Sequence, residues 1–255
     1  MIPRLHVPLP LHADEDLALP PGPAKHVQVL RLQPGSPLVL FDGKGGEWSA
    51  EVVSMGRSDV TVRVGSHDAV SRELPVHVTL ALGMPANERM DGLVEKACEL
   101  GVGAMQPLVC ERSVLKLKDD RAERRVERWQ GVASAACEQS GGTRLPIVAP
   151  IAKIGDYLRI LSPTMPSERR FLLSFADDSK PVAECLAGAD ALDRCLVLSG
   201  PEGGLSEAEE AAARQKGFAA VSLGPRVLRA DTAPLAMLAA IAAITTGRRG
   251  VGNAS

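Results

Sequence analysis

The segment CLVLSGPEGGLSEAE, residues 195–209, combines a strand pattern, a glycine-rich turn and a helix start. Residues 195–199 form a short apolar run, which is typical of a buried strand. Ser206 and Glu209 have the spacing of a capping box, so we expect a helix that runs to about Gln215. A buried strand that leads directly into an amphipathic helix predicts an α/β fold with a parallel sheet.

The same alternation of strand and helix fills the chain from about residue 73 onward. Further strands are predicted at Val76–Leu82, Gly103–Cys110, Phe171–Phe175 and Ala219–Leu223, and helices at Asn87–Leu100 and Asp120–Ser140. Gly101 and Gly141 stand where helices stop, and Pro234 stands in the first turn of a last helix. We therefore predict one α/β domain over residues 73–250, followed by a loose tail at Val251–Ser255.

Residues 1–72 have a different pattern, which predicts a separate all-β domain. Strands are expected at Ser36–Phe41, Glu47–Val53 and Asp59–Val64, as a small meander or barrel. The glycine-rich segment Gly43–Gly46 resembles a phosphate cradle in composition. It joins two strands and opens no helix, so we predict a hairpin turn.

Composition excludes several classes of protein. The chain has 255 residues, 45% hydrophobic and 24% charged, which is typical of a folded domain rather than a disordered one. It has no apolar stretch long enough to span a membrane and no apolar signal core, so we expect a cytoplasmic protein without a membrane partner. The five cysteines form no C-x-x-C pair, and all five histidines lie within the first 77 residues. A metal site is therefore not predicted.

Net charge is −2, which argues against a protein that coats nucleic acid, but one segment is locally basic. Between residues 112 and 128 there are seven cations and four anions: Arg112, Lys116, Lys118, Arg121, Arg124, Arg125 and Arg128 against Asp119, Asp120, Glu123 and Glu127. An ion-paired, solvated helix face is the ordinary interpretation. Contact with phosphates remains open as the alternative.

Two glycine-rich segments, residues 198–205 and 223–233, follow predicted strands that we expect to be neighbours in the sheet, and they are candidates for a ligand site. Ligands of open α/β sheets bind at the carboxyl ends of strands, and glycine lets the backbone approach a ligand closely. Neither segment contains a P-loop or a G-x-G-x-x-G fingerprint. A cofactor held through adenine and backbone groups remains open, and ordinary strand-to-helix turns are the alternative.

These segments resemble a known family. GPEGGL (200–205), LGPRVLR (223–229) and the following Thr232-Ala233 are similar to the last two motifs of the SPOUT methyltransferases, in the RsmE branch that methylates N3 of a uridine in 16S ribosomal RNA. Four other segments support the resemblance over nearly the whole chain: HVQVLRL (26–32), EKACELGV (95–102), ERS (111–113) and EQSGG (138–142).

The resemblance implies a PUA-like RNA-binding β-barrel at residues 1–72 and a SPOUT domain with a C-terminal trefoil knot at residues 73–250. It implies a homodimer that holds S-adenosyl-L-methionine in the knot and acts on 16S rRNA, within the 30S subunit. The apolar stripe from Leu235 to Ile244 and the helix that contains Trp129 also predict a homodimer, because they offer more apolar faces than one sheet can cover. The cofactor-binding positions that match are Leu173, Ser174, Gly200, Glu202, Gly203, Gly204, Leu223, Gly224, Val227, Leu228 and Arg229. The family usually has Glu where this chain has Asp231, which would still serve as an N-cap for the last helix.

Two residues are candidates for catalysis. Glu202 would accept the uracil N3 proton, directly or through water, and Arg229 would stabilise charge on the uracil oxygens. The alternatives are a helix-capping role for Glu202 and a surface ion pair for Arg229. Candidates for contact with RNA are His26, Arg31, Arg112, Arg124, Arg125, Glu138 and Gln139, with purely structural roles as the alternative. Rival functions are a SPOUT enzyme acting on tRNA or on ribose 2′-OH, and a noncatalytic RNA-binding assembly factor.

Overall fold

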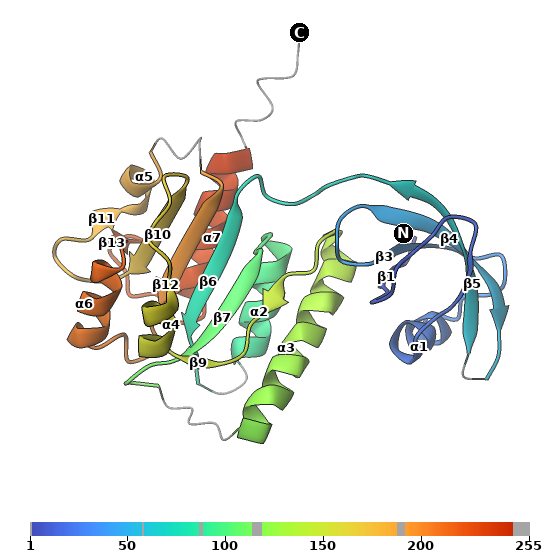
Figure 1. Cartoon of the computed structure of the whole chain (residues 1–255), viewed down its shortest axis with the longest axis horizontal. Coiled ribbons are helices and arrows are strands. Elements are labelled where there is room, and N and C mark those ends of the chain that lie inside the picture. The colour runs from blue at the N-terminus through green and yellow to red at the C-terminus, as the bar shows by residue number, and fades with distance from the viewer. Residues whose placement is uncertain (1, 58, 87–88, 114–118, 188–191, 247–255) are drawn as a thin grey trace, which may run out of the picture. The chain divides into compact units, whose positions relative to one another are not determined.

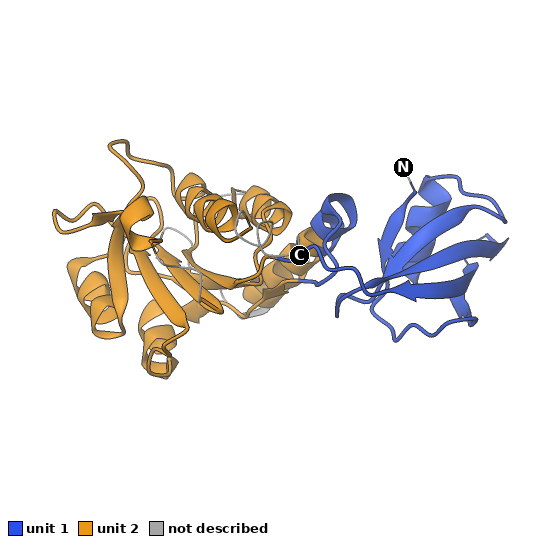
Figure 2. Ribbon diagram, turned by 90° about the horizontal axis from the view of Figure 1, so that it is seen from above, with its two compact units in different colours: residues 1–73, 134–145 blue, residues 74–133, 146–255 orange. Residues whose placement is uncertain are grey.

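A computed structural model describes residues 2–57, 59–86, 89–113, 119–187 and 192–246 (Figure 1). The predicted helix start at Asn87, the cations Lys116 and Lys118, and the tail Val251–Ser255 lie outside the described residues. The chain divides into two compact units (Figure 2). The first contains residues 1–73 and 134–145, and the second contains residues 74–133 and 146–255. The predicted domain boundary after residue 72 stays a prediction.

The first unit is built on a five-stranded sheet, in the order β1-β3-β4-β5-β2. Its strands are β1 (Arg4–His6), β2 (Asp16–Ala18), β3 (Pro37–Phe41), β4 (Glu47–Met55) and β5 (Val60–Asp68). β1 pairs with β3 in parallel, and the other pairs are antiparallel. The order begins at β1 and ends at β2, so closure into a barrel stays a prediction.

The expectation of an all-β N-terminal part is wrong, because the first unit contains the helix α1 (Pro21–Val29). Proline is favoured in the first turn of a helix, where its missing N–H costs nothing, and Pro21 and Pro23 lie there. The segment after them alternates polar and apolar residues over a short stretch, which resembles a strand. In the helix, Ala24 and Val27 are buried in the core of the unit, whereas Val29 is exposed.

The second unit contains an eight-stranded sheet in the order β11-β13-β10-β12-β6-β7-β8, with β9 also paired to β7. Every pair in it is parallel, as predicted. Its strands are β6 (His77–Gly83), β7 (Ala104–Val109), β8 (Ile147–Val148), β9 (Ala152–Lys153), β10 (Glu168–Leu173), β11 (Lys180–Pro181), β12 (Arg194–Ser199) and β13 (Phe218–Ser222). The short strands β8, β9 and β11 escape the sequence pattern because each has only two residues.

The helices of the chain's second part are α2 (Arg89–Glu99), α3 (Asp119–Ser140), α4 (Ile154–Ile160), α5 (Val182–Cys185), α6 (Glu207–Gln215) and α7 (Thr232–Thr246). α7 packs on β6 and β12 and against α2, whereas α6 packs on β10 and β13 and against α4. Parallel strands need cover of this kind on both faces, which explains their nearly continuous apolar sequences. α3 contributes residues to both units. No helix in the described part of the chain could cross a membrane.

Sheet order corrects one expectation about the two glycine-rich loops. The sequence suggested that they follow neighbouring strands, but β10 lies between β12 and β13 and pairs with both. All three strands are parallel, so their carboxyl ends meet at one edge of the sheet. The segment after β10 therefore becomes the middle of the candidate site.

Candidate functional site

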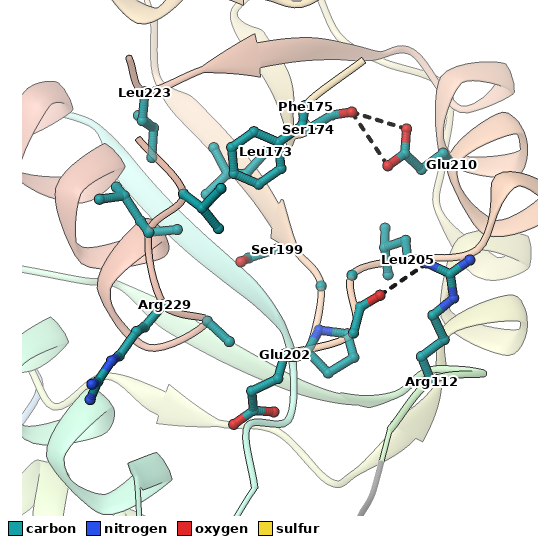
Figure 3. Close-up of a pocket in the computed structure, with 18 of the residues that line it drawn as sticks. Arg112, Leu173, Ser174, Phe175, Ser199, Glu202, Leu205, Glu210, Leu223 and Arg229 are labelled. Carbon is teal, nitrogen blue, oxygen red and sulfur yellow. Dashed lines mark hydrogen bonds between the residues drawn. The ribbon is translucent and has the colours of Figure 1, made fainter. Parts of the chain in front are cut away.

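A cavity of about 700 Å³ opens at the carboxyl ends of β10, β12 and β13 (Figure 3). Three segments supply most of its walls: residues 173–176, 199–205 and 221–233. Of the eleven cofactor-binding residues predicted, all except Gly224 line this cavity. The lining combines leucine and valine side chains with exposed backbone and with four arginines and three glutamates: Arg89, Arg112, Arg226, Arg229, Glu202, Glu207 and Glu210.

The loop after β12 is so compact that a side chain would not fit at some of its glycine positions. A β-carbon on Gly200 would lie 2.9 Å from both the carbonyl carbon of Gly204 and the nitrogen of Leu205. Gly204 has a φ of +69° and donates to the Pro201 carbonyl at 2.8 Å. A β-carbon on Gly83, at the end of β6, would lie 2.6 Å from the Pro201 nitrogen. Glycine is therefore required for the loop to fold on itself and against β6.

Glu202 fastens this loop to the segment after β6. Its two carboxylate oxygens both accept from the backbone N–H of Ala86, at 2.9 and 3.1 Å. Arg89 adds a cation 3.7 Å from Oε1. The capping alternative is wrong, because Ser206 and Glu209 form the capping box of α6, as the sequence predicted. The carboxylate therefore acts as a tie between two loops.

Arg112 holds the same loop from another side. Its Nη1 donates to the Gly203 carbonyl at 3.0 Å, and a β-carbon on Gly203 would lie 3.0 Å from the β-carbon of Arg112. The neighbouring Glu111 N–H donates to Glu209 at 2.8 Å, which ties the end of β7 to α6. Arg112 therefore reaches the cavity within a single chain.

The segment after β10 brings a polar pair and an aromatic ring to the cavity. Ser174 is buried; its hydroxyl donates to the Glu210 carboxylate at 3.0 Å and accepts from the Ala176 N–H at 3.1 Å. Phe175 beside it is 70% exposed. Figure 3 shows the Ser174–Glu210 pair and the side chains of Glu202 and Arg229 at different ends of the cavity.

Arg229 belongs to the third loop, which ends at α7. Its carbonyl accepts from the N–H groups of Thr232 and Ala233, each at 3.0 Å. Its guanidinium has no ion-pair partner among the residues that the structure describes, so the surface ion-pair alternative is not realised there. The expected cap is also missing: Asp231 Oδ1 is buried without a hydrogen-bond partner in the described chain. Val227 is 82% exposed on the same loop.

The predicted RNA-contact residues are divided between the two units. Arg112, Arg124 and Arg125 belong to the second unit, whereas His26, Arg31, Glu138 and Gln139 belong to the first. His26 lies on the helix α1, and its Nδ1 is 3.5 Å from Glu138 Oε2. The other oxygen of Glu138 accepts from the His6 N–H at 2.8 Å.

The basic stretch on α3 is ion-paired only in part. Arg128 pairs with Asp91, which also accepts from the Trp129 indole at 3.1 Å. Arg124 is exposed, and neither it nor Arg125 has an ion-pair partner among the side chains that the structure describes, which do not include those of Asp119 and Asp120. The solvated-helix interpretation holds for Arg128, and contact with phosphates remains open for the other two.

Possible metal ligands and reactive thiols were sought among the described residues. No group of three or more metal-ligating side chains occurs among the described residues. Burial raises the pKa of Cys110 to about 12 and that of Cys195 to about 11, so both thiols stay protonated.

Sequence reasoning missed several residues that line the cavity, among them Arg89, Phe175, Glu207 and Glu210. It also missed Ala86, whose contact is made by the backbone and carries no sequence signal. Glu207 and Glu210 lie in the predicted first turn of α6, and the sequence shows no other sign that they line a cavity.

Comparison with known protein families identifies both parts of the chain. Residues 72–242 match the RNA methyltransferase domain, and residues 24–65 match the RNA methyltransferase PUA domain.

Curated relatives match over most of their length. The Bacillus subtilis ribosomal RNA small subunit methyltransferase E is 32% identical over 88% of each chain. The Synechocystis protein of the same name is 36% identical over 85% of this chain and 69% of its own length.

Solved structures agree with these matches. Ribosomal RNA small subunit methyltransferase E from Neisseria gonorrhoeae, bound to S-adenosyl methionine, superposes with a TM-score of 0.86 at 33% identity, over 96% of this chain and 98% of that one. A putative methyltransferase from Legionella pneumophila, in complex with the same cofactor, has a TM-score of 0.89 at 30% identity, with the same coverage of both chains.

Proposed function

Because this chain belongs to the ribosomal RNA small subunit methyltransferase E family, we propose that it transfers a methyl group from S-adenosylmethionine to N3 of one uridine in 16S rRNA. The family is an RNA methyltransferase family, and the chain matches its relatives across both of its parts. The observation that carries the proposal is the cavity formed by the ends of β10, β12 and β13, because it collects ten of the eleven residues predicted to bind the cofactor.

The lining of the cavity suits S-adenosylmethionine. Leu173, Leu223 and Leu228 offer an apolar surface for the adenine, and the glycine-rich loop after β12 brings backbone groups close to the ligand. Glu210 supplies negative charge for a ligand that carries a sulfonium and an ammonium group. When bound, the cofactor supplies an electrophilic methyl group.

The chain's own contribution is orientation and control of charge. Uracil N3 carries a proton that must leave before or during the transfer, and the resulting anion places charge on the uracil oxygens. Arg229, at the cavity with no ion-pair partner in the described chain, is positioned to stabilise that charge. For Glu202 the contacts favour a positioning role in place of the predicted base, since both oxygens already accept from Ala86.

The substrate side of the proposal rests on the predicted RNA-contact residues, five of which are basic. N3 is hidden in a paired base, so the uridine must be turned out of its helix or lie in a loop. We assign contact with RNA to Arg112, Arg124 and Arg125 in the second unit, and to His26, Arg31, Glu138 and Gln139 in the first, which contains the PUA match. Phosphate contacts then carry much of the affinity.

The proposal includes the features that the family resemblance implies. These are a barrel in the first unit, a trefoil knot formed by the segments that line the cavity, a homodimer, and action in the cytoplasm on the 30S subunit.

The test uses the modification itself. A methyl group on N3 blocks Watson–Crick pairing and stops reverse transcriptase. Cells that lack this protein should lose one such stop in 16S rRNA, and purified protein with S-adenosylmethionine should restore it on 30S particles. A stop that persists in the deletion strain contradicts the proposal. Methylation only of tRNA or of ribose would favour another SPOUT activity, and cofactor-independent binding without methylation would favour an assembly factor.

A further inference from the structure

The glycine-rich turn Gly43–Gly46 presents one lysine on a specially shaped backbone. It joins β3 to β4 as the predicted hairpin turn. Gly43, Gly45 and Gly46 have φ values of +77°, +118° and +72°. A β-carbon on Gly43 would lie 2.9 Å from the β-carbon of Leu145, and one on Gly46 would lie 2.2 Å from His67 Nε2. Within this turn, therefore, Lys44 is the position that has room for a side chain.

A second cation reaches this turn from the segment after α3. Arg144 forms an antiparallel bridge with Lys44, and the Leu145 N–H donates to the Gly43 carbonyl at 3.0 Å. Residues opposite each other in such a bridge project to the same face, with β-carbons about 4.5–5.5 Å apart. Lys44 and Arg144, here called the cation pair, are thus neighbours on one surface of the first unit.

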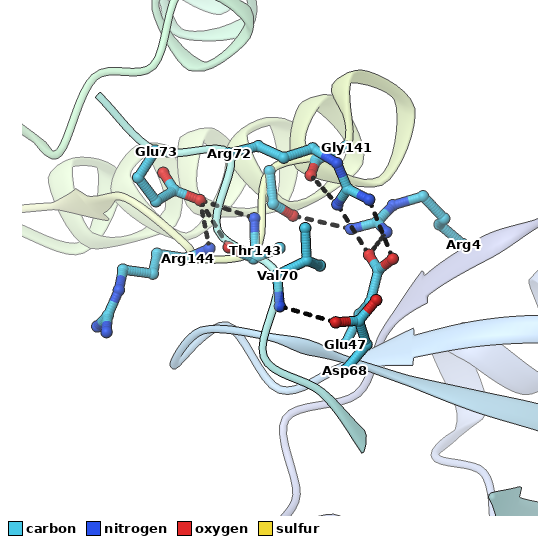
Figure 4. A network of polar contacts seen from close by, with 10 residues as sticks. Arg4, Glu47, Asp68, Val70, Arg72, Glu73, Gly141, Thr143 and Arg144 are labelled. Carbon is cyan, nitrogen blue, oxygen red and sulfur yellow. Dashed lines mark hydrogen bonds and ion pairs between the residues drawn. The ribbon is translucent and has the colours of Figure 1, made fainter. Parts of the chain in front are cut away.

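Arg144 is held in place by contacts on both its backbone and its side chain. Its N–H donates to Glu73 Oε1 at 2.9 Å, and the same oxygen accepts from the Thr143 N–H at 2.8 Å. Its guanidinium lies against Gly45, with Nη2 3.2 Å from the β-carbon position of that glycine. Figure 4 shows the Arg144 side chain extending away from Glu73 and from the polar network around it.

The charge of the cation pair is hardly neutralised. Arg144 has no ion-pair partner within the described chain, and Lys44 is 74% exposed, with only Asp42 at 4.0 Å. Like charges directly opposite each other destabilise a bridge. These two cations are nevertheless held side by side by the three glycines of the turn, by Glu73 and by the bridge. This arrangement favours a role of the cation pair in binding an anion.

We propose that the cation pair binds phosphates of the RNA backbone. A planar guanidinium and a mobile ammonium group on one exposed surface suit phosphate oxygens, which accept several charge-assisted hydrogen bonds. Contacts of this kind orient an RNA without reading its sequence. The inference rests on the proposed function for the identity of the ligand. It adds a binding site whose two residues lie outside the motifs that carry the family resemblance.

The test measures binding of a 16S rRNA transcript to the full chain as a function of salt. The double variant Lys44→Gln with Arg144→Gln should lower affinity about tenfold at low salt and reduce the slope of log K against log salt by about 1.4 to 1.8. Affinity for S-adenosylmethionine should stay as in the unmodified chain, and the melting temperature should not fall, because the removed charges repel each other. The charge-preserving variant Lys44→Arg with Arg144→Lys should keep the slope.

The matched control removes two exposed cations that already have partners. Lys96 pairs with Glu95 and Glu99, and Arg159 pairs with Asp156. Lys96→Gln with Arg159→Gln changes net charge equally and should leave the slope unchanged.

An unchanged slope in the cation-pair variant, or an equal loss in the charge-preserving variant, overturns the inference. If the unmodified chain binds and methylates 16S rRNA in the same experiments, the proposed function survives that failure. An unmodified chain that does not bind the transcript or 30S particles contradicts the proposed function instead.

Discussion

Gly200 and Gly203 show how single residues shape the cavity. A side chain at Gly200 would collide with the backbone of Gly204 and Leu205, and one at Gly203 would push on Arg112. We expect Gly200→Ala to weaken S-adenosylmethionine binding more than tenfold and Gly203→Val to abolish it, as measured by calorimetry. In α3, Gly131 has no atom within 4 Å of its β-carbon position, so Gly131→Ala should keep the affinity and add about 0.5–1 kcal/mol of stability. Unchanged affinity in Gly203→Val would remove this loop from the site.

Substitutions of the single residue Glu202 distinguish a role in positioning the loop from a role as the catalytic base. Glutamine keeps a side-chain oxygen that can accept from Ala86, so Glu202→Gln should change kcat/KM less than threefold and preserve the pH–rate profile. Glu202→Ala should raise the Kd for S-adenosylmethionine about tenfold, since a hydrogen bond to a charged group is lost, with a smaller effect on the single-turnover rate at saturation. A Gln variant that is at least a hundredfold slower and lacks one ionisation in its profile would identify Glu202 as the base instead.

At the scale of elements, a polar network joins strands of the first unit to the residues after α3 (Figure 4). Arg72 donates to both oxygens of Glu47, at 2.9 and 3.0 Å, and to the Gly141 carbonyl at 3.1 Å. Arg4 pairs with Glu47 and donates to the Gly142 carbonyl at 3.0 Å. Hydrogen bonding to Arg72, with Arg4 beside it, lowers the pKa of Glu47 from 4.5 to about 2.

This shift predicts an acid-sensitive contribution to stability. Because the folded-state pKa is lowered, the stabilisation is complete above the unfolded value of 4.5 and is lost as pH falls from there to about 2. Glu47→Gln should cost on the order of 2 kcal/mol at pH 7 and flatten this part of the profile in urea unfolding. Glu51→Gln, on the same strand and exposed, should have little effect. An acid limb that is equally steep in Glu47→Gln would show that other groups cause it.

At the scale of the whole molecule, the argument for a homodimer changes. The sequence suggested that the Trp129 helix and the stripe from Leu235 to Ile244 need a partner chain. Trp129 is only 1% exposed within one chain, and Leu238 and Ile241 are fully buried. The prediction of a dimer therefore depends on the family resemblance and on the partly exposed remainder of α7.

Light scattering at micromolar concentration tests this prediction. We expect twice the mass of one chain, which is 26.9 kDa. A monomer that methylates 16S rRNA would contradict the dimer and leave the enzyme assignment intact. If activity is lost when the protein is diluted below the dissociation constant of the dimer, methyl transfer requires the dimer.

The sequence by itself determined the features that depend on near neighbours along the chain. The capping box of α6, the positive φ of Gly101 and Gly141 at helix ends, and the parallel sheet all follow from local spacing. The ambiguous segment after Pro23 is the local exception, because a short alternation suits a strand and a helix equally. The family motifs also identified ten of the residues that line the cavity.

Only the tertiary structure decided which distant segments meet. The position of β10 between β12 and β13, the tie from Glu202 to Ala86, and the bridge between Lys44 and Arg144 each join residues far apart in the chain. Two of these depend on backbone groups, which every residue carries and no sequence pattern marks. Strand order depends on which packing of the whole sheet buries the most apolar surface, so no local window contains it.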